Sequence, residues 1–448
     1  MGSINLNRLK GKIVVKEDAD YDRCRLSWNM AIDIHPEAIV YCLSKDDVSN
    51  NIKYCIENSI QFRIRNGAHN YEGYSTGDGV IVLDVSKMSK IYMDEENRKV
   101  TIEGGVRNRE AYDMLCSKGY PFPGGGCPTV GIAGLVLGGG WGYSSRYFGL
   151  ACDSLIEVEL IDYKGELITA NESINEDLFW AVKGCGGGNF GVVVSMTFKL
   201  ADKVENVTLI DIEYKNLEPC NQVTVIKTYM SMFKNLDNKI NCKMAVYNSL
   251  EKGRGIKIIG LYYGEKGEAE KILKPLLSFE YKRNLNLTYT SILDANTIIQ
   301  DSHPDYEKYK STGRFVYDDY SEEEIKDIIS LLDDRAVGAV YAAITFYGLG
   351  GAVFEKNKED GAFYYRDAKF ILGFQSLFED DEYKNENTKW FLEKFNFIKK
   401  ITKGSFINFP LSELDDYGYE YYGENYEKLK RIKLKYDPYG KFNFEQSI

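Results

Sequence analysis

Short apolar runs alternate with segments of helical spacing through the first 200 residues. Four of the apolar runs predict strands, at 36–42, 62–65, 80–85 and 100–106. Strand patterns return at 155–170 and 191–200. Ser44, followed by Asp47, predicts a helix N-terminus, and a second helix is predicted over 109–118, closed by Gly119. This alternation predicts an α+β or α/β domain.

Beyond residue 200 the pattern changes. Long strand-like runs begin at Val207, Lys257 and Ala339, and amphipathic helices are predicted over 220–235 and 321–333. Glycine becomes rarer, so we place a domain boundary near residue 201. A final helix is predicted over 422–436, before Asp437 and Pro438.

Composition narrows the function classes. The 448 residues are 44% hydrophobic and 27% charged, which excludes wholesale disorder, and the net charge of -11 makes the chain a poor nucleic-acid binder. No apolar stretch approaches the ~20 residues of a membrane span. The first ten residues lack a continuous apolar core, so we expect no secretory signal, no membrane partner and a cytoplasmic location. None of the nine cysteines forms a C-x-x-C pair, and three histidines disfavour a metal site.

Two segments match known functional motifs, but each is followed by a strand where the motif requires a helix. Residues 73–77 match the G-x-S-x-G nucleophile elbow of hydrolases, but a strand follows instead of a helix. Residues 186–191 match the G-x-G-x-x-G dinucleotide fingerprint, but they too precede a strand, at Val192. A serine hydrolase and a Rossmann domain are therefore both disfavoured.

Two glycine-rich loops each carry one reactive side chain. The first, 65–73, contains His69, and the second, 124–142, contains Cys127. Glycines allow close backbone approach and point N–H groups at an anion, which suits a pyrophosphate. An imidazole in one loop and a thiol in the other suggest two covalent anchors for a cofactor.

These loops resemble those of the berberine bridge enzyme-like flavoproteins, which share the vanillyl-alcohol-oxidase (PCMH) type of FAD domain. The first loop fits R-x-G-x-H-x-Y-E-G, and the second fits C-P-T-V-G followed by a glycine triplet. Residues 186–193 and the tail from Tyr421 to Ile448 fit two further motifs of the family. The resemblance implies an α+β fold with three parts: a two-part FAD-binding domain at 1–200, a substrate domain with an antiparallel sheet flanked by helices at 201–403, and a C-terminal segment at 404–448 that returns to the FAD domain.

The resemblance also implies residue roles. His69 would bond the 8α-methyl group of FAD and Cys127 its C6 carbon. Val130, three residues after that cysteine, resembles the residue that admits oxygen in the family's oxidases. The cofactor-binding residues implied besides these three are Arg65, Asn66, Gly67, Ala68, Asn70, Thr129, Gly131, Gly134, Gly138, Gly142, Gly191, Val192, Asn425 and Asn443.

The chain departs from the family where a substrate proton is removed. The family's Tyr-x-Asn-Tyr motif reads Phe406-Ile-Asn-Phe409 here, and an upstream strand that often carries polar groups is apolar at 370–374. Tyr71 is the best remaining phenol, with Tyr365 in reserve. A phenol acts as a base only if its pKa is lowered, and Arg366 is the expected cation.

The predicted function is an FAD-dependent oxidase that takes a hydride from an alcohol-type carbon of a small molecule and reduces O2 to H2O2. Sugars, phenolic alcohols and secondary metabolites all remain possible substrates. Three alternatives stay open: a dehydrogenase with another acceptor, a flavin-binding protein without turnover, and the disfavoured hydrolase.

Overall fold

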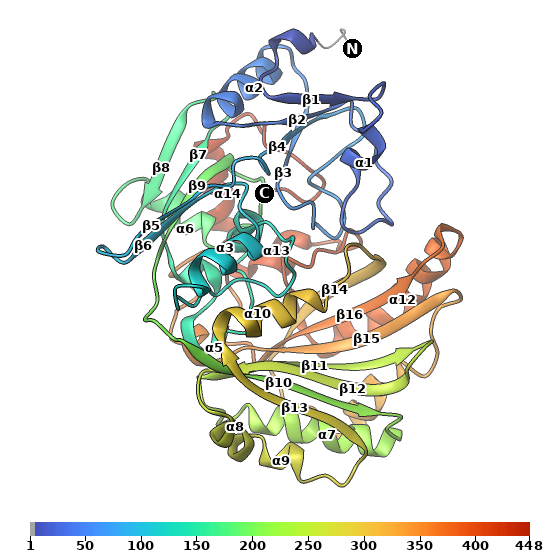
Figure 1. Cartoon of the computed structure of the whole chain (residues 1–448). Coiled ribbons are helices and arrows are strands. Elements are labelled where there is room, and N and C mark those ends of the chain that lie inside the picture. Colours follow the sequence, from blue (N-terminus) through green and yellow to red (C-terminus); the bar gives the residue numbers. More distant parts are fainter. Residues whose placement is uncertain (1–4) are drawn as a thin grey trace.

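A computed structural model describes residues 5–448, so the first four residues of the segment in which no secretory signal is expected lie outside it. In Figure 1 the N-terminal part, coloured blue to green, forms one half of the molecule. An eight-stranded sheet forms the other half, and the last residues return to the first half. Among residues 5–448 no helix is long and apolar enough to cross a membrane.

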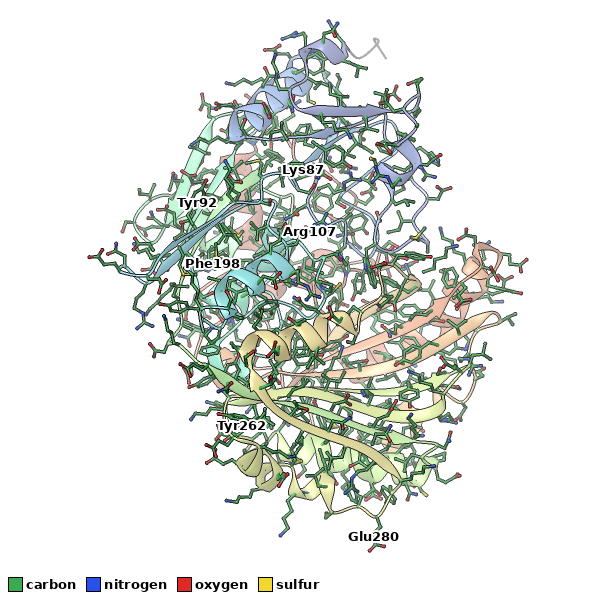
Figure 2. The ribbon with its side chains drawn as sticks, in the orientation of Figure 1. Lys87, Tyr92, Arg107, Phe198, Tyr262 and Glu280 are labelled. Carbon is green, nitrogen blue, oxygen red and sulfur yellow. The ribbon has the colours of Figure 1, made fainter. Side chains whose placement is uncertain are left out.

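The N-terminal half contains two sheets. One has the order β1 (Lys12–Val15), β2 (Ala38–Tyr41), β4 (Ile81–Asp84), β3 (Phe62–Arg65), with β2, β4 and β3 parallel. The other is antiparallel, with the order β5 (Ile91–Asp94), β6 (Lys99–Glu103), β9 (Val192–Lys199), β7 (Leu155–Ile161), β8 (Leu167–Asn171). Phe198 of β9, labelled in Figure 2, is fully buried and meets Phe122 edge-on, whereas Tyr92 of the edge strand β5 is 56% exposed.

The eight-stranded sheet is antiparallel and draws its strands from widely separated segments. Its order is β13 (Arg283–Ser291), β10 (Asn206–Lys215), β12 (Gly253–Tyr262), β11 (Ile240–Ser249), β15 (Ala339–Gly348), β16 (Phe370–Phe378), β14 (Lys308–Val316), β17 (Lys403–Ser405). This is the antiparallel sheet expected for the second half, and the α+β class is confirmed.

The helices surround these sheets. In the N-terminal half they are α1 (Tyr21–Arg25), α2 (Lys45–Glu57), α3 (Asn108–Cys116), α4 (Ile132–Leu137), α5 (Ser145–Phe148) and α6 (Glu176–Val182). The second half has α7 (Pro219–Met232), α8 (Lys266–Ile272), α9 (Lys274–Leu277), α10 (Ile292–Asp301), α11 (Glu322–Ser330) and α12 (Lys384–Ile401). Helices α7 to α9 lie below the sheet in Figure 1, while α10 packs against α3 on the side of the N-terminal half.

The predicted elements are found at nearly the expected places. The Ser44 hydroxyl accepts a hydrogen bond from the Asp47 N–H at 3.2 Å, which caps α2 as expected. The C-terminal helix is shorter than predicted, because Gly423, with a φ of +51°, separates α13 (Tyr417–Tyr422) from α14 (Tyr426–Tyr436). Residues 186–191 lead into β9 and open no helix, as their context predicted.

Candidate active site

The first glycine-rich loop leaves the end of β3 in a constrained conformation. Ala68 has a φ of +57°, which is unusual for a residue with a side chain, and its carbonyl accepts a hydrogen bond from the Trp28 N–H at 3.0 Å. The Trp28 ring stacks on His69 with centroids 5.0 Å apart. The backbone geometry and the stacked ring together fix where His69 lies.

Helix α3 holds the second loop in place. The Asn108 N–H donates to the Val130 carbonyl at 3.0 Å, and the Asn108 side-chain amide donates to the Cys127 carbonyl at 2.9 Å. Thr129 then connects the two loops, since its Oγ1 lies 2.7 Å from His69 Nε2 and 3.7 Å from Cys127 Sγ. The imidazole and the thiol therefore meet on either side of one hydroxyl.

Burial sets the electrostatics of this pair. Loss of hydration, helped by the charges of Arg107 and His303, lowers the pKa of His69 to about 3, so its ring is neutral and keeps a free lone pair at neutral pH. Burial raises the pKa of Cys127, although hydrogen bonds from Thr129 oppose the shift. The thiol is therefore mostly protonated at neutral pH.

Both side chains line a cavity of about 1130 Å³ between the two halves. Twelve of the sequence-predicted site residues line it: Asn66, Gly67, Ala68, His69, Asn70, Tyr71, Cys127, Val130, Gly131, Gly134, Gly191 and Asn443. Such a volume exceeds the ~300–1,000 Å³ of ordinary ligand pockets and leaves room for a dinucleotide together with a substrate.

Several predicted cofactor residues do not line the cavity. The Arg65 guanidinium is buried in an ion pair with Asp84 at 2.6 Å, across the paired strands β3 and β4. Gly138 and Gly142 are glycines for packing reasons, because a Cβ would lie 2.0 Å from Asn408 Oδ1 and from the Gly124 carbonyl, respectively.

Three further residues also lie off the cavity wall. Thr129 does not line the cavity, but its hydroxyl contacts the His69 side chain that does. Val192 is fully buried in β9, and its neighbours Gly191 and Val193 line the cavity instead. Asn425 does not line the cavity either, and its side-chain amide donates to the Lys358 carbonyl at 2.8 Å.

Tyr365, the expected reserve base, and Arg366, the expected cation, also lie away from the cavity. The Tyr365 hydroxyl donates to the Glu420 carbonyl at 2.6 Å, and its ring stacks on Phe315, so it does not line the cavity. Arg366 forms two hydrogen bonds to Asp153, at 2.7 and 2.8 Å, and does not approach Tyr71. Arg366 is therefore not placed to lower the pKa of Tyr71.

Tyr71 does face the cavity, but as part of an aromatic wall. Its ring stacks on Phe409 at 5.1 Å and meets Tyr309 edge-on at 5.0 Å. Burial, together with the nearby Tyr347, Glu307 and Cys127, raises the pKa of Tyr71 well above its ordinary value of 10. This environment opposes the predicted use of Tyr71 as a base.

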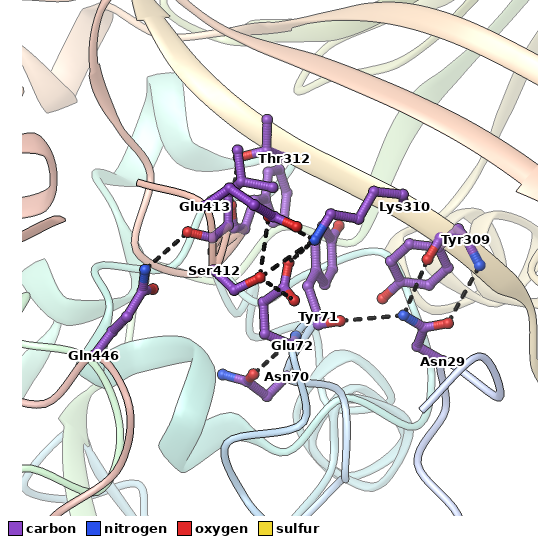
Figure 3. Close-up of polar contacts among 12 residues, drawn as sticks. Asn29, Asn70, Tyr71, Glu72, Tyr309, Lys310, Thr312, Ser412, Glu413 and Gln446 are labelled. Atoms are coloured by element: carbon purple, nitrogen blue, oxygen red, sulfur yellow. Dashed lines mark hydrogen bonds and ion pairs between the residues drawn. The ribbon is translucent and has the colours of Figure 1, made fainter. Parts of the chain in front are cut away.

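Polar contacts bind the Tyr71 loop to the other parts of the chain (Figure 3). Lys310 of β14 pairs with Glu72 and Glu413, each at 2.8 Å, and the Ser412 hydroxyl donates to Glu72 at 3.0 Å. The Asn29 amide donates to the Tyr71 carbonyl at 3.1 Å. The loop, the large sheet and the C-terminal segment therefore meet at this point.

Sequence reasoning missed several side chains of the cavity wall. They are Trp28, Lys243, His303, Glu307 and Tyr309, none of which was among the predicted site residues. Burial and the charge of Lys243 lower the pKa of His303 to about 4. Trp141 also lines the wall and donates its indole N–H to the Gly348 carbonyl at 2.7 Å.

The cavity fits FAD on two independent observations. Buried polar atoms of its lining residues have no hydrogen-bond partner among residues 5–448: Trp28 Nε1, Arg63 Nε, Asn66 Oδ1, Tyr74 OH, Ser75 Oγ and Tyr309 OH. Such atoms are costly unless a ligand or water satisfies them. An added Cβ at Gly134 would meet nothing within 4 Å, and at Gly187 only the Gly134 Cα at 3.9 Å, so both glycines face open space.

Comparisons with known proteins define the class. A family model described as FAD binding domain matches residues 36–171, and one described as berberine and berberine like matches residues 405–448. YgaK of Bacillus subtilis (strain 168), an FAD-linked oxidoreductase, is 35% identical, and the alignment covers 98% of this chain and 97% of that protein.

Solved structures agree with this class. Physcomitrella patens BBE-like 1 is 25% identical with a TM-score of 0.88, covering 98% of this chain and 96% of that one. The xylooligosaccharide oxidase of Myceliophthora thermophila C1 in complex with xylobiose shares the fold at 22% identity, with a TM-score of 0.88, covering 98% and 97%. The chain belongs to the berberine bridge enzyme-like family of FAD-linked oxidoreductases, and FAD is its cofactor.

Proposed function

We propose that this enzyme is an oxidase that removes a hydride from an alcohol-type carbon of a small molecule and passes the electrons to O2. Bound FAD would supply the chemistry by accepting the hydride. The neighbouring oxidase whose structure contains xylobiose supports a hydroxylic substrate, as does the polar wall that the large sheet contributes, with Ser311, Thr345 and Gln375.

The observation that carries the proposal is the meeting of His69 and Cys127 across Thr129. With Nε2 engaged by the Thr129 hydroxyl at 2.7 Å, Nδ1 of His69 is the nitrogen left to form a bond with the flavin. Cys127 faces the same cavity, so both side chains can reach one ligand. We therefore propose that FAD is attached twice, through His69 and Cys127.

Acid precipitation tests the double attachment. The precipitated protein should stay yellow, and mass spectrometry of a digest should find flavin on peptides containing each residue. His69→Ala and Cys127→Ala should each keep one bond, and the double variant should release all its flavin into the supernatant. Free FAD released from the wild type would refute the attachment.

Anaerobic mixing tests the reaction itself. D-Glucose, xylobiose and 4-hydroxybenzyl alcohol serve as probes of the sugar and phenolic classes, and bleaching of the flavin absorbance reports hydride transfer. Reduced enzyme should then reoxidise in aerated buffer and release H2O2. Reoxidation no faster than that of free reduced flavin would favour a dehydrogenase with another acceptor.

A further inference from the structure

Two oppositely charged side chains of the large sheet face the cavity near Cys127. Lys243 lies on β11, and Glu307 directly precedes β14. Among residues 5–448 neither head group has an ion pair or a side-chain hydrogen bond, although each contributes to the electrostatics of the other. The Lys243 ammonium lies over the Tyr143 ring, 5.9 Å from its centroid. A carboxylate and an ammonium that line a cavity without an ion pair are available to a ligand.

The backbone of Glu307 is firmly placed. Its N–H donates to the Trp28 carbonyl at 3.2 Å, and its carbonyl accepts from the Met30 N–H at 2.8 Å. Trp28 is the residue whose ring stacks on His69. The segment that orients His69 therefore also positions Glu307, from the opposite half of the molecule.

The groups facing Glu307 come from every neighbouring element. They are Lys243 of β11, Tyr341 and Tyr347 of β15, Tyr309 of β14, Tyr71 of the first loop and Cys127 of the second. All of these side chains line the same cavity as Glu307. The Glu307 charge raises the pKa of each of these tyrosines and of the cysteine. Lys243 also lowers the pKa of His303.

We propose that Glu307 accepts the hydroxyl proton of the substrate and that Lys243, on the same cavity wall, serves as its counter-charge. The inference rests on the proposed oxidase function. The carboxylate comes from the start of β14, because β16, where the family often places polar groups, is apolar at Ile371 and Gly373. Tyr71 is the poorer base, since burial raises its pKa and its expected cation is bound elsewhere.

The step balances without a further reactant. Bound FAD would take the substrate C–H electron pair as a hydride, the O–H bond would break with its proton passing to Glu307, and a carbonyl group would form. The proton then leaves Glu307 for solvent. Burial raises the pKa of Glu307 to about 7, opposed by the charge of Lys243, so the carboxylate form that can act as a base predominates above that pH.

Glu307→Gln in the flavin-loaded enzyme tests the proposal, because it keeps the size of the side chain and removes its base. Flavin reduction by the probe that bleaches the wild type should slow by ~10²–10⁴-fold. The wild-type rate should fall as pH drops through the ionisation of Glu307, and the variant should lose that dependence. Lys243→Met should move the ionisation to higher pH, which a merely structural lysine would not do.

A second measurement does not depend on turnover. Infrared difference spectra of the flavin-loaded enzyme between pH 5 and pH 9 should show a carboxylic acid C=O band titrating near neutral pH. The band should vanish in Glu307→Gln and persist in Glu355→Gln, a control at an exposed glutamate. A Glu307 band that titrates in the ordinary glutamate range, or a Glu307→Gln rate near that of the wild type, would overturn the proposal. Failure of every probe to bleach the wild type would instead count against the oxidase function.

Discussion

The ion pair between Arg366 and Asp153 allows a test of how much more a buried ion pair contributes to the stability of the fold than an exposed one. The two side chains are 5% and 7% exposed, and two parallel hydrogen bonds of 2.7 and 2.8 Å join them. Burial alone would lower the pKa of Arg366, but the Asp153 charge outweighs it and the pKa is raised. The pair joins the segment before β16 to the residues just before β7.

Arg366→Met leaves the Asp153 carboxylate buried and unpaired. Breaking a buried pair from one side costs about 3–5 kcal/mol. The matched control is Lys227→Met, which removes a pair with Glu322 whose side chains are 56% and 60% exposed. An exposed pair contributes about 0–1 kcal/mol, so the control should unfold nearly as the wild type does.

Urea unfolding followed by tryptophan fluorescence measures both variants. Arg366→Met combined with Asp153→Asn should recover part of the loss, because the asparagine removes the stranded charge and its oxygen still accepts from the Leu150 N–H. The reasoning is refuted if Arg366→Met lowers the free energy of unfolding no more than Lys227→Met does. It is also refuted if the double variant is less stable than Arg366→Met alone.

Three further outcomes follow from the cavity. Gly134→Leu fills space that faces the cofactor, so its ratio of flavin to protein absorbance should fall, while Gly267→Leu, at another helical glycine with nothing within 4 Å of an added Cβ, should keep full flavin. Val130→Leu should slow the reoxidation of reduced enzyme by O2 without changing the rate of flavin reduction, as measured by stopped flow. The flavin of Tyr71→Phe should be reduced within about tenfold of the wild-type rate and with the wild-type pH profile. A positioned base contributes ~10²–10⁴-fold to the rate, and Tyr71 is not placed to be one. A larger loss of rate that also removes the ionisation from the pH profile would restore Tyr71 as the base.

Local patterns were enough to predict the elements and the two cofactor loops. Strand runs and the Ser44 cap depend on neighbouring residues, and His69 and Cys127 lie within glycine-rich segments that are visible in the sequence. Gly138 and Gly142, predicted as cofactor residues, do not line the cavity, for a related reason. A glycine required by packing against Asn408 or Gly124 looks the same in a sequence as one that cradles a ligand.

The substrate side could not be predicted because it depends on the order of strands in the large sheet. Lys243 and Glu307 lie 64 positions apart in the chain and are brought to one wall by the order β11-β15-β16-β14. Tyr365, which precedes β16, does not line the cavity, because only the far end of that strand reaches it, at Gln375 and Leu377. A strand rises ~3.3 Å per residue, so Gln375 lies roughly 17 Å beyond the start of β16 at Phe370.

One face of the large sheet explains how the position of a base can change without a change of fold. Most cavity-lining residues of its central strands alternate in the chain: Lys243, Ala245 and Ser249 on β11; Tyr341, Thr345 and Tyr347 on β15; Gln375 and Leu377 on β16; Tyr309 and Ser311 on β14. Val340, at the irregular start of β15, is an exception. The residues of the opposite alternation on β16, Leu372, Phe374 and Ser376, are buried on the other face, where Phe374 stacks on Trp390 and Phe391 of α12. Because neighbouring side chains of a strand point to opposite faces, the cavity face can exchange polar and apolar residues while the core face stays the same. Glu307 is two residues before Tyr309 on this alternation, so the same scaffold can supply a carboxylate from the segment before β14 in place of a polar group from β16.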